Sequence, residues 1–360
     1  MSISLNKDSF FLRLAFQQAE INLGSTKINP SVGCIIVKKN SVISSAHTSR
    51  NGRPHAEANA LNKKLDFSGS KMFVTLEPCS HYGKTPPCVN KIIKKKINQV
   101  SFSINDTDLR SKNLSIKKLK KKKIKVKRFT LNKFAKNFYK SYFLQSTNAL
   151  PLIDGKLAIS NDYLTINTKN RWITNEHSRK VANFIRSQYD CILSTSKTIN
   201  KDNPLLDCRI KSLEKNSPAL IIIDRFFKIK KNLKIFSNKG RKIHIITNIC
   251  NPSKEKYFKK LGVKIIRINK KYPAAELNEI FMKIKHIGFN RVLIETGITF
   301  LNKLLQKKLI ENFYLFKSTK NLSLNGLNNC SSHFIKKIKL SKINKIRINL
   351  KDDNLYKVRL

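Results

Sequence analysis

Residues 78–88 read Pro-Cys-Ser-His-Tyr-Gly-Lys-Thr-Pro-Pro-Cys, and residues 55–57 read His-Ala-Glu. Within the 34 residues from 55 to 88, the imidazole of His55, the thiols of Cys79 and Cys88 and the carboxylate of Glu57 form a set suited to a metal site. Zinc favours nitrogen and sulfur ligands, and a catalytic zinc site uses three protein ligands and leaves the fourth position to water. We therefore expect His55, Cys79 and Cys88 to bind one zinc ion, with both cysteines as thiolates.

Glu57, two residues after His55, is expected to stay off the metal and to move protons. This arrangement is typical of zinc nucleobase deaminases, in which the metal activates a water molecule and a glutamate shuttles its proton. A closed structural zinc clip, or two unrelated buried cysteines, is the alternative. The His-x-Glu pair and the proline before each cysteine favour the catalytic interpretation. For His81, a role beside the metal, a substrate contact, a fourth zinc ligand and an ordinary loop position all stay open.

The spacing of the two cysteines differs from that of nucleic-acid deaminases, which have two residues between them. Here eight residues separate Cys79 from Cys88, and Pro86-Pro87 leads into an apolar-periodic run. Because proline is favoured in the first helical turn, we expect Cys88 at the N-terminus of a helix. The helix dipole there favours the thiolate form of the cysteine.

Length and composition limit the classes of protein. A chain of 360 residues with 40% hydrophobic residues predicts two packed domains. It has no apolar run long enough to span a bilayer, and its first residues lack the layout of a signal peptide. Seven cysteines scattered over both halves argue against a disulfide framework. We expect a cytoplasmic protein with no membrane partner.

The charge is extreme, with 73 Lys and Arg against 22 Asp and Glu, a formal net charge of +51. One interpretation is nucleic-acid binding. The other is compositional drift towards Lys, Ile and Asn, as an AT-rich genome would produce. The lysines are spread along the chain, and the one dense block, 117–128, lacks interleaved aromatic residues. We favour drift, with a secondary benefit for phosphorylated substrates, and expect no nucleic-acid partner.

Hydrophobic periodicity indicates alternating helices and strands in the first half. An amphipathic helix is expected over 1–25 and ends near Gly24. His55 and Glu57 should lie in the first turn of a helix over 56–65, and Cys79 should follow a strand. A further helix is expected within 129–150. The predicted strands of this half cover 34–37, 42–44, 72–76, 100–104 and 124–126.

The motifs of this half resemble a known family. NPSVGC at 29–34, HAEANAL at 55–61 and LEPCSHYGKTPPC at 76–88 are similar to the deaminase half of the bifunctional deaminase/reductase of riboflavin biosynthesis. The resemblance implies a cytidine-deaminase-like αβα sandwich. It also implies zinc ligation by His55, Cys79 and Cys88, and Glu57 as the catalytic proton shuttle. The implied substrate is 2,5-diamino-6-(5-phosphoribosylamino)pyrimidin-4(3H)-one, a small phosphorylated pyrimidine that loses its 2-amino group as ammonia.

Strand and helix patterns alternate after Pro151, which predicts a second α/β domain. No Gly-x-Gly occurs anywhere, so a nicotinamide cofactor must bind without the usual dinucleotide fingerprint. The predicted strands cover 152–159, 190–193, 219–223, 243–247, 263–268, 291–294 and 313–316. The predicted helices cover 175–188, 252–261, 274–287 and 299–309.

Three local features of this half carry chemistry. Trp172, the only tryptophan, could cover a flat ligand, although a core position is the more common one. Hydroxyls at 194–198 suit a phosphate-rich ligand or form a polar turn. The segment 295–300 joins a buried strand to a helix start, where free N–H groups suit a pyrophosphate. The alternative is ordinary capping of that helix by Thr299.

These features resemble the reductase half of the same family, which implies a dihydrofolate-reductase-like α/β fold that uses NADPH. The implied reaction converts the ribosyl group of 5-amino-6-(5-phosphoribosylamino)uracil to ribityl. Arg186 and Arg209 make physical sense as clamps for the 5′-phosphate. By resemblance, the NADPH contacts are Ala158, Trp172, Thr198, Asp202, Arg225, Gly297, Ile298 and Thr299. The implied substrate contacts are Asn170, Arg186, Leu206, Arg209 and Glu295.

The second half also departs from the family pattern. Asn161-Asp162-Tyr163 replaces a Leu-Asp-Gly turn, the loop before Trp172 is about two residues short, and Asn170 stands where serine is common.

We predict a zinc deaminase over 1–147 and an NADPH-dependent reductase over 148–360, in a homo-oligomer (dimer or tetramer). The alternatives are a tRNA or DNA deaminase, a deaminase with a degenerate reductase half, and a non-catalytic zinc protein.

Overall fold

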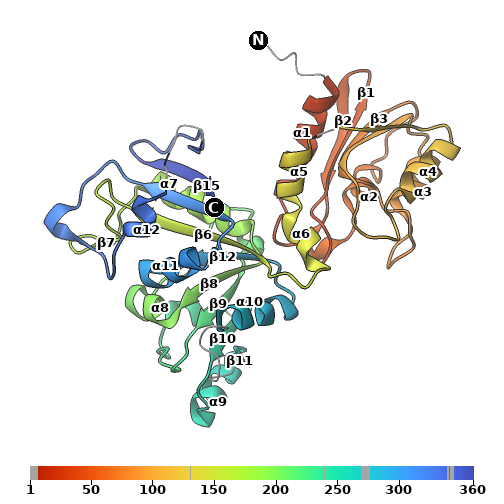
Figure 1. Cartoon of the computed structure of the whole chain (residues 1–360). Helices are drawn as coiled ribbons and strands as arrows, with labels where there is room; N and C mark the ends of the chain where they lie inside the picture. The colour runs from red at the N-terminus through yellow and green to blue at the C-terminus, as the bar shows by residue number, and fades with distance from the viewer. Residues whose placement is uncertain (1–6, 130, 239, 269–275, 339, 341–343) are drawn as a thin grey trace. The chain divides into compact units, whose positions relative to one another are not determined.

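The computed structural model describes residues 7–129, 131–238, 240–268, 276–338, 340 and 344–360. The chain divides into two compact units, Met1–Asn148 and Ala149–Leu360 (Figure 1). Among the described residues, no helix is both long and apolar enough to cross a membrane.

The first unit is built on one five-stranded sheet in the order β2-β1-β3-β4-β5. Strand β1 pairs antiparallel with β2 and with the central strand β3, whereas β3, β4 and β5 run parallel. Nearly every residue of β1, β3 and β4 is buried, so both faces of the sheet must be covered. The strands are β1 (Gly33–Lys38), β2 (Ser41–His47), β3 (Lys71–Leu76), β4 (Gln99–Ile104) and β5 (Lys125–Arg128).

Helices cover both faces of this sheet. Figure 1 shows α1, α5 and α6 on one side and α2, α3 and α4 on the other, which makes three layers. Helix α1 packs on β1 and β3, and α2 packs on β1 and β2. The helices are α1 (Lys7–Glu20), α2 (Ala56–Ala60), α3 (Cys88–Lys94), α4 (Leu114–Lys121), α5 (Asn132–Phe138) and α6 (Lys140–Gln145), with a 3-10 turn at Arg50–Gly52.

The predicted strands of this unit are confirmed, but the helices differ. Helix α2 ends at Ala60 rather than at Leu65. Ser44 Oγ donates a hydrogen bond to the Ala60 carbonyl (2.8 Å) and Lys91 Nζ donates one to the Ala58 carbonyl (3.2 Å). These side chains take the acceptors that a longer helix would use.

Two other helix predictions are also too long. Helix α1 ends at Glu20, and Gly24 lies in the following turn with φ of 83°. The first six residues of that prediction lie outside the described residues. The segment 129–150 forms two helices, α5 and α6, instead of one.

The second unit is built on an eight-stranded sheet in the order β11-β10-β9-β8-β12-β6-β13-β15. All neighbours run parallel except β15, which is antiparallel to β13. A small ribbon of β7 and β14 is separate from this sheet. The strands are β6 (Leu152–Ile159), β7 (Ile166–Asn167), β8 (Cys191–Thr195), β9 (Ala219–Ile223), β10 (Ile243–Thr247), β11 (Lys264–Arg267), β12 (Arg291–Glu295), β13 (Asn312–Lys317), β14 (Gly326–Leu327) and β15 (Asn354–Arg359).

Two hydrophobic cores lie on the two faces of this sheet, because alternate residues of each strand point to opposite sides. Cys191 and Leu193 share one core with Phe281 of α10 and Leu301 of α11. Ile192 shares the other with Ile185 of α7 and Phe258 of α9. The helices are α7 (Glu176–Ser187), α8 (Ser196–Asp202), α9 (Pro252–Lys260), α10 (Glu276–His286), α11 (Ile298–Gln306) and α12 (His333–Lys336).

All seven strands predicted for this unit are confirmed to within about two residues, and so are the helices within 175–188, 252–261 and 274–287. The helix predicted over 299–309 is confirmed as α11, but it ends at Gln306, three residues early. Ala274, where one of these helices was expected to begin, lies outside the described residues. Strand β15 was not predicted, and the hydroxyl-rich segment at 194–198 opens helix α8 instead of forming a turn. Thr195 caps that helix by accepting a hydrogen bond from the backbone N–H of Thr198.

Candidate functional site

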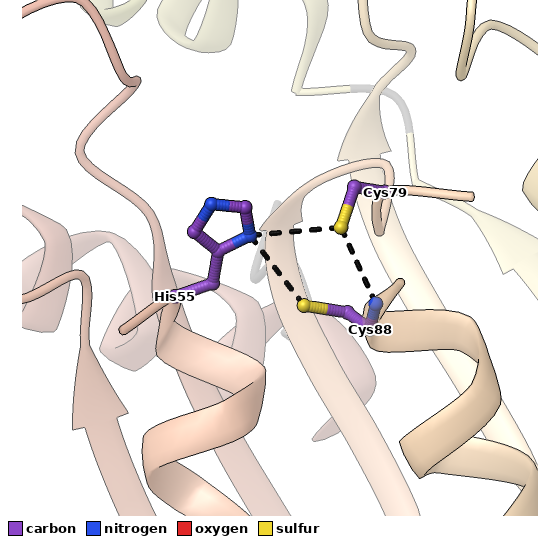
Figure 2. Close-up of side chains that lie close together, drawn as sticks. All are labelled: His55, Cys79 and Cys88. Carbon is purple, nitrogen blue, oxygen red and sulfur yellow. Dashed lines mark hydrogen bonds between the residues drawn. The ribbon is translucent and has the colours of Figure 1, made fainter. Parts of the chain in front are cut away.

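Three chain segments bring His55, Cys79 and Cys88 together in the first unit (Figure 2). His55 is the N-cap of α2 and has an extended backbone conformation. Cys79 lies in the loop that follows β3, and Cys88 is the first residue of α3, as the two prolines before it predict. The three side chains point toward one another from a loop and two helix starts.

The spacing of their ligand atoms fits zinc. His55 Nδ1 lies 3.6 Å from Cys79 Sγ and 3.5 Å from Cys88 Sγ. Around a tetrahedral zinc ion, with bonds of about 2.0 Å to nitrogen and 2.3 Å to sulfur, such ligands lie about 3.5 Å apart. The Cys88 N–H also donates a hydrogen bond to Cys79 Sγ (3.3 Å). The donor set and its spacing therefore match a three-ligand zinc site.

Electrostatics favour a thiolate in this cluster. The side chain of Cys88 and the imidazole of His55 lower the pKa of Cys79 to about 4, although burial opposes them. The same contact with Cys79, together with burial, raises the pKa of Cys88. Both sulfur atoms would bind zinc as thiolates, because ligand thiols lose their protons when they bind the metal.

Glu57 is buried beside this cluster, with 4% of its surface exposed. It is the second residue of α2, and its side chain interacts with that of Cys88. Burial and the negative charge at Cys79 raise the pKa of Glu57 to about 7. A carboxyl group with such a pKa can both take up and release a proton near neutral pH.

His81 lies outside the three-ligand cluster among the described residues. Its Nδ1 is 2.8 Å from Ser111 Oγ, which also accepts a hydrogen bond from the Ser80 N–H (3.3 Å). Lys118 Nζ donates a hydrogen bond to the Ser80 carbonyl (2.7 Å). The structure therefore argues against His81 as a fourth zinc ligand and does not choose among a role beside the metal, a substrate contact and an ordinary loop position.

Glu77 is a supporting residue that the sequence did not single out. Its buried carboxylate accepts hydrogen bonds from Ser115 Oγ (2.5 Å), Asn105 Nδ2 (2.9 Å) and the Asp106 N–H (3.3 Å). Since Glu77 comes two residues before Cys79, these bonds fix the backbone that carries a zinc ligand. Its position in the Glu-Pro-Cys motif, two residues before a zinc ligand, was the feature of the sequence that could have indicated this supporting role.

The second unit contains a cavity of about 1580 Å³. It opens where β6, β8, β9 and β12 end, the usual ligand position in sheets of parallel strands. Asn170 does not line it: the Asn170 N–H donates a hydrogen bond to Asn167 Oδ1 (3.1 Å) in the shortened loop. The other twelve residues proposed for NADPH and substrate do line it: Ala158, Trp172, Arg186, Thr198, Asp202, Leu206, Arg209, Arg225, Glu295, Gly297, Ile298 and Thr299.

Hydroxyl and backbone groups gather at the start of α11 in this cavity. The Gly297 N–H donates a hydrogen bond to Thr198 Oγ1 (3.2 Å), and the hydroxyl oxygens of Thr195, Thr198 and Thr296 lie 3.1–3.3 Å apart. Gly297 is the N-cap of α11, so the suggested cap by Thr299 is wrong. The start of this helix, together with these hydroxyls, suits a pyrophosphate.

Glu295, at the end of β12, forms a buried charge cluster on the cavity wall. Arg186 binds it through both Nε–Oε1 (2.6 Å) and Nη2–Oε2 (2.9 Å), and Lys156 Nζ lies 3.6 Å from Oε2. Burial alone would raise the pKa of Glu295, but the two cations hold it at about 2. Both arginines pair with a carboxylate, but Arg186 is nearly buried against Glu295, whereas Arg209 is half exposed and pairs with Asp207 at 3.2 Å.

Trp172 is half exposed, so a core position is wrong for it. The guanidinium groups of Arg171 and Arg179 lie 5.0 and 4.6 Å from its ring centroid. These cations stabilise the ring through cation–π contacts while leaving part of the indole open to the cavity.

Comparison with known proteins assigns both units. Residues 5–104 match the cytidine and deoxycytidylate deaminase zinc-binding region, and residues 152–322 match the RibD C-terminal domain. The riboflavin biosynthesis protein RibD of Buchnera aphidicola is 31% identical over 334 residues, which cover 87% of each chain. The chain belongs to the RibD family of riboflavin biosynthesis proteins. Its Aquifex aeolicus member is 28% identical over 322 residues, again 87% of each chain.

Solved structures of the family confirm the fold expected for both units. A diaminohydroxyphosphoribosylaminopyrimidine deaminase/5-amino-6-(5-phosphoribosylamino)uracil reductase of Thermotoga maritima superposes with a TM-score of 0.79 at 25% identity, over 98% of both chains. Acinetobacter baumannii RibD shares the fold, with a TM-score of 0.80 at 24% identity over 99% of both chains. The chain is therefore an enzyme of riboflavin biosynthesis that joins a zinc-binding deaminase domain to a reductase domain.

Proposed function

We propose that residues 1–147 catalyse the zinc-dependent hydrolytic deamination of 2,5-diamino-6-(5-phosphoribosylamino)pyrimidin-4(3H)-one. We further propose that residues 148–360 use NADPH to reduce the ribosyl group of the product, 5-amino-6-(5-phosphoribosylamino)uracil, to ribityl. The observation that carries the proposal is the His55, Cys79 and Cys88 cluster with buried Glu57 beside it. Since this is the single such cluster within the described part of the chain, we expect one zinc ion per chain.

In the deaminase half, His55, Cys79 and Cys88 hold the metal. When bound, zinc lowers the pKa of water to about 7, so that a nucleophile forms at neutral pH. Glu57 accepts the proton of that water as it attacks C2 of the pyrimidine, and delivers a proton to the departing amine. Burial of Glu57 supports this role because it keeps the carboxyl from being strongly acidic.

In the reductase half, the start of α11 at Gly297–Thr299 holds the cofactor pyrophosphate, and Thr198 contributes a hydroxyl. When bound, NADPH supplies the hydride that opens the ribosyl ring. Glu295 contacts the substrate, with Arg186 and Lys156 keeping it ionised and fixed. Arg209, which is more exposed than Arg186, receives the 5′-phosphate.

We also propose that this enzyme acts on small phosphorylated pyrimidines as a cytoplasmic homo-oligomer, without a nucleic-acid or membrane partner. Light scattering measures the oligomeric state directly. A chain that stays a monomer at all concentrations tested argues against that part of the proposal.

The test is ammonia release by zinc-loaded full chain from the diaminopyrimidinone ribosyl phosphate, repeated after zinc removal and after zinc return. Activity that disappears with zinc and returns with it supports the deaminase. A parallel sample receives a cytosine- or adenine-containing oligonucleotide. Ammonia from the oligonucleotide and none from the ribosyl phosphate would favour the nucleic-acid alternative, and none from either would favour a non-catalytic zinc protein.

A further inference from the structure

Arg225, Phe226 and Lys228 form one corner of the reductase cavity, in the turn that follows β9. Phe226 is 66% exposed, although it is a large apolar side chain. Water-exposed aromatic rings on a cavity wall are a usual feature of sites for flat ligands. The corner belongs to the second unit and does not include the Arg186–Glu295 pair, so its features need their own explanation.

A buried carboxylate fixes this corner. Asp224, 2% exposed, accepts hydrogen bonds from Ser196 Oγ (2.8 Å) and from the backbone N–H groups of Lys228 (2.8 Å) and Ile229 (2.7 Å). Phe227 is buried between the two outward-facing residues. The side chains of Phe226 and Lys228 are therefore presented to the cavity by a preformed turn, which lowers the ordering cost of binding.

Two cationic side chains flank the exposed ring of Phe226. The guanidinium of Arg225 lies 5.9 Å and Lys228 Nζ lies 5.8 Å from the centroid of the Phe226 ring. Arg225 Nη1 is bound by Glu276 Oε2 at 3.2 Å, so one carboxylate orients one of the two cations. In dinucleotide sites, an acid suits the free 2′-hydroxyl of NAD, whereas a nearby arginine accommodates the 2′-phosphate of NADP. Of the two acids at this corner, Asp224 is buried and accepts hydrogen bonds from Ser196 and from backbone N–H groups, and Glu276 pairs with Arg225. Lys228 is therefore the cation that favours the phosphate.

Strand order decides which end of a dinucleotide reaches this corner. In the order β9-β8-β12-β6, the start of α11 after β12 has β9 on one side and β6 on the other. Lys156 of β6 contacts Glu295, the proposed substrate residue, so the nicotinamide end belongs on the β6 side. A cofactor whose pyrophosphate sits at Gly297–Thr299 therefore sends its adenosine end toward β9.

We propose that Phe226 is the platform for the adenine ring of NADPH and that Lys228, beside Arg225, binds its 2′-phosphate and makes this enzyme select NADPH over NADH. The proposal rests on the proposed reductase function. Adenine is common to both cofactors, so the phenyl ring contributes to the binding of each. The 2′-phosphate occurs in NADPH alone, so the Lys228 ammonium contributes to selectivity.

Steady-state kinetics of the full chain with NADPH and with NADH separates the two roles. Lys228→Gln is expected to lower kcat/KM for NADPH about tenfold, the usual scale of one lost charge-assisted contact, and to change that for NADH less than twofold. Lys228→Arg restores the preference. Phe226→Ala lowers kcat/KM for both cofactors by a similar factor, and Phe226→Tyr keeps it. Lys256→Gln, an exposed lysine of α9 outside the cavity, is the matched control for lost surface charge.

Calorimetry with adenosine 2′,5′-bisphosphate and with adenosine 5′-monophosphate tests the corner without any turnover. The parent is expected to bind the bisphosphate more tightly, and Lys228→Gln is expected to remove that difference. Equal ratios of NADPH to NADH activity in parent and Lys228→Gln, or equal affinities for the bisphosphate, overturn the proposal. If the parent oxidises neither cofactor, the proposed reductase function fails. The calorimetry then still tests whether Lys228 binds a 2′-phosphate.

Discussion

Arg186 of α7 and Glu295 of β12 form a two-point ion pair across 109 residues of sequence, with N–O distances of 2.6 and 2.9 Å. Both side chains are nearly buried, and Lys156 approaches the same carboxylate from β6. The pair joins a helix to the strand that leads into the proposed pyrophosphate site. It therefore serves the stability of the reductase unit as well as the placement of Glu295.

Arg186→Met is expected to destabilise the second unit by about 3 kcal/mol, because breaking a buried pair leaves an incompletely compensated charge. The measurement is the urea midpoint of this unit, followed by fluorescence of its only tryptophan, Trp172. Lys180→Met is the matched control on the same helix, where an exposed Lys180–Glu176 pair is removed. We expect no measurable change for the control. Equal shifts for both variants would contradict the argument.

The lowered pKa of Glu295 predicts the pH dependence of stability. Its folded pKa, about 2, lies below the ordinary 4.5, so the ionised form stabilises the fold. This contribution is complete above about pH 4.5 and is lost as the pH falls toward 2. The stability difference between parent and Glu295→Gln should therefore stay constant from pH 8 to 5 and shrink below. A difference that already changes between pH 7 and 5 would show that the pKa is not lowered.

Glu57→Gln is expected to retain zinc but to lose deamination by a factor of about 10²–10⁴, the usual contribution of a general acid–base group. The amide keeps the size of the side chain and leaves His55, Cys79 and Cys88 in place. Metal analysis and ammonia release are measured on the same sample. NADPH oxidation with the deaminated ribosyl phosphate as substrate is the internal control and should not change. Full turnover by this variant would remove Glu57 from the mechanism.

Ser115→Ala is expected to cost about 1–3 kcal/mol in the first unit, because it removes a hydrogen bond to the buried Glu77 carboxylate. Ser103→Ala is a matched control in the same unit. Ser103 is equally buried, but its Oγ has no hydrogen-bond partner among the described residues, so its removal should cost little. Chemical denaturation of both variants gives the comparison. A similar cost at both positions would mean that Glu77 gains nothing from Ser115.

Much of this architecture could be predicted from sequence. Buried strands such as β9 (Ala219–Ile223) and β10 (Ile243–Thr247) are short apolar runs between polar segments, and their bounds were predicted without error. The zinc cluster could be predicted because a zinc site needs few residue types and these lie close together in the sequence. Prolines before His55 and Cys88 also indicate that both residues lie where a helix begins.

The remaining features depend on contacts that are distant in sequence. Helix α2 ends at Ala60, where Ser44 and Lys91 donate hydrogen bonds to its carbonyl groups, and no local sequence pattern shows these contacts. The ion pair between Arg186 and Glu295 likewise could not be predicted without knowing the order of the strands in the sheet. Asn170 was carried over by resemblance, and the shortened loop leaves it outside the lining of the cavity. Helix α8 could have been found, since Thr195 and Thr198 form a recognisable N-cap pattern.

The most direct test of the bifunctional assignment is a two-stage assay on one sample of zinc-loaded full chain. The diaminopyrimidinone ribosyl phosphate is added first and ammonia is followed, and NADPH is added second and its oxidation is followed by absorbance. We predict ammonia release and then NADPH oxidation that depends on the first stage. Ammonia without NADPH oxidation would mean that the altered loops around Asn161 and Asn170 have abolished the reductase. No ammonia from a sample with verified zinc would contradict the central claim.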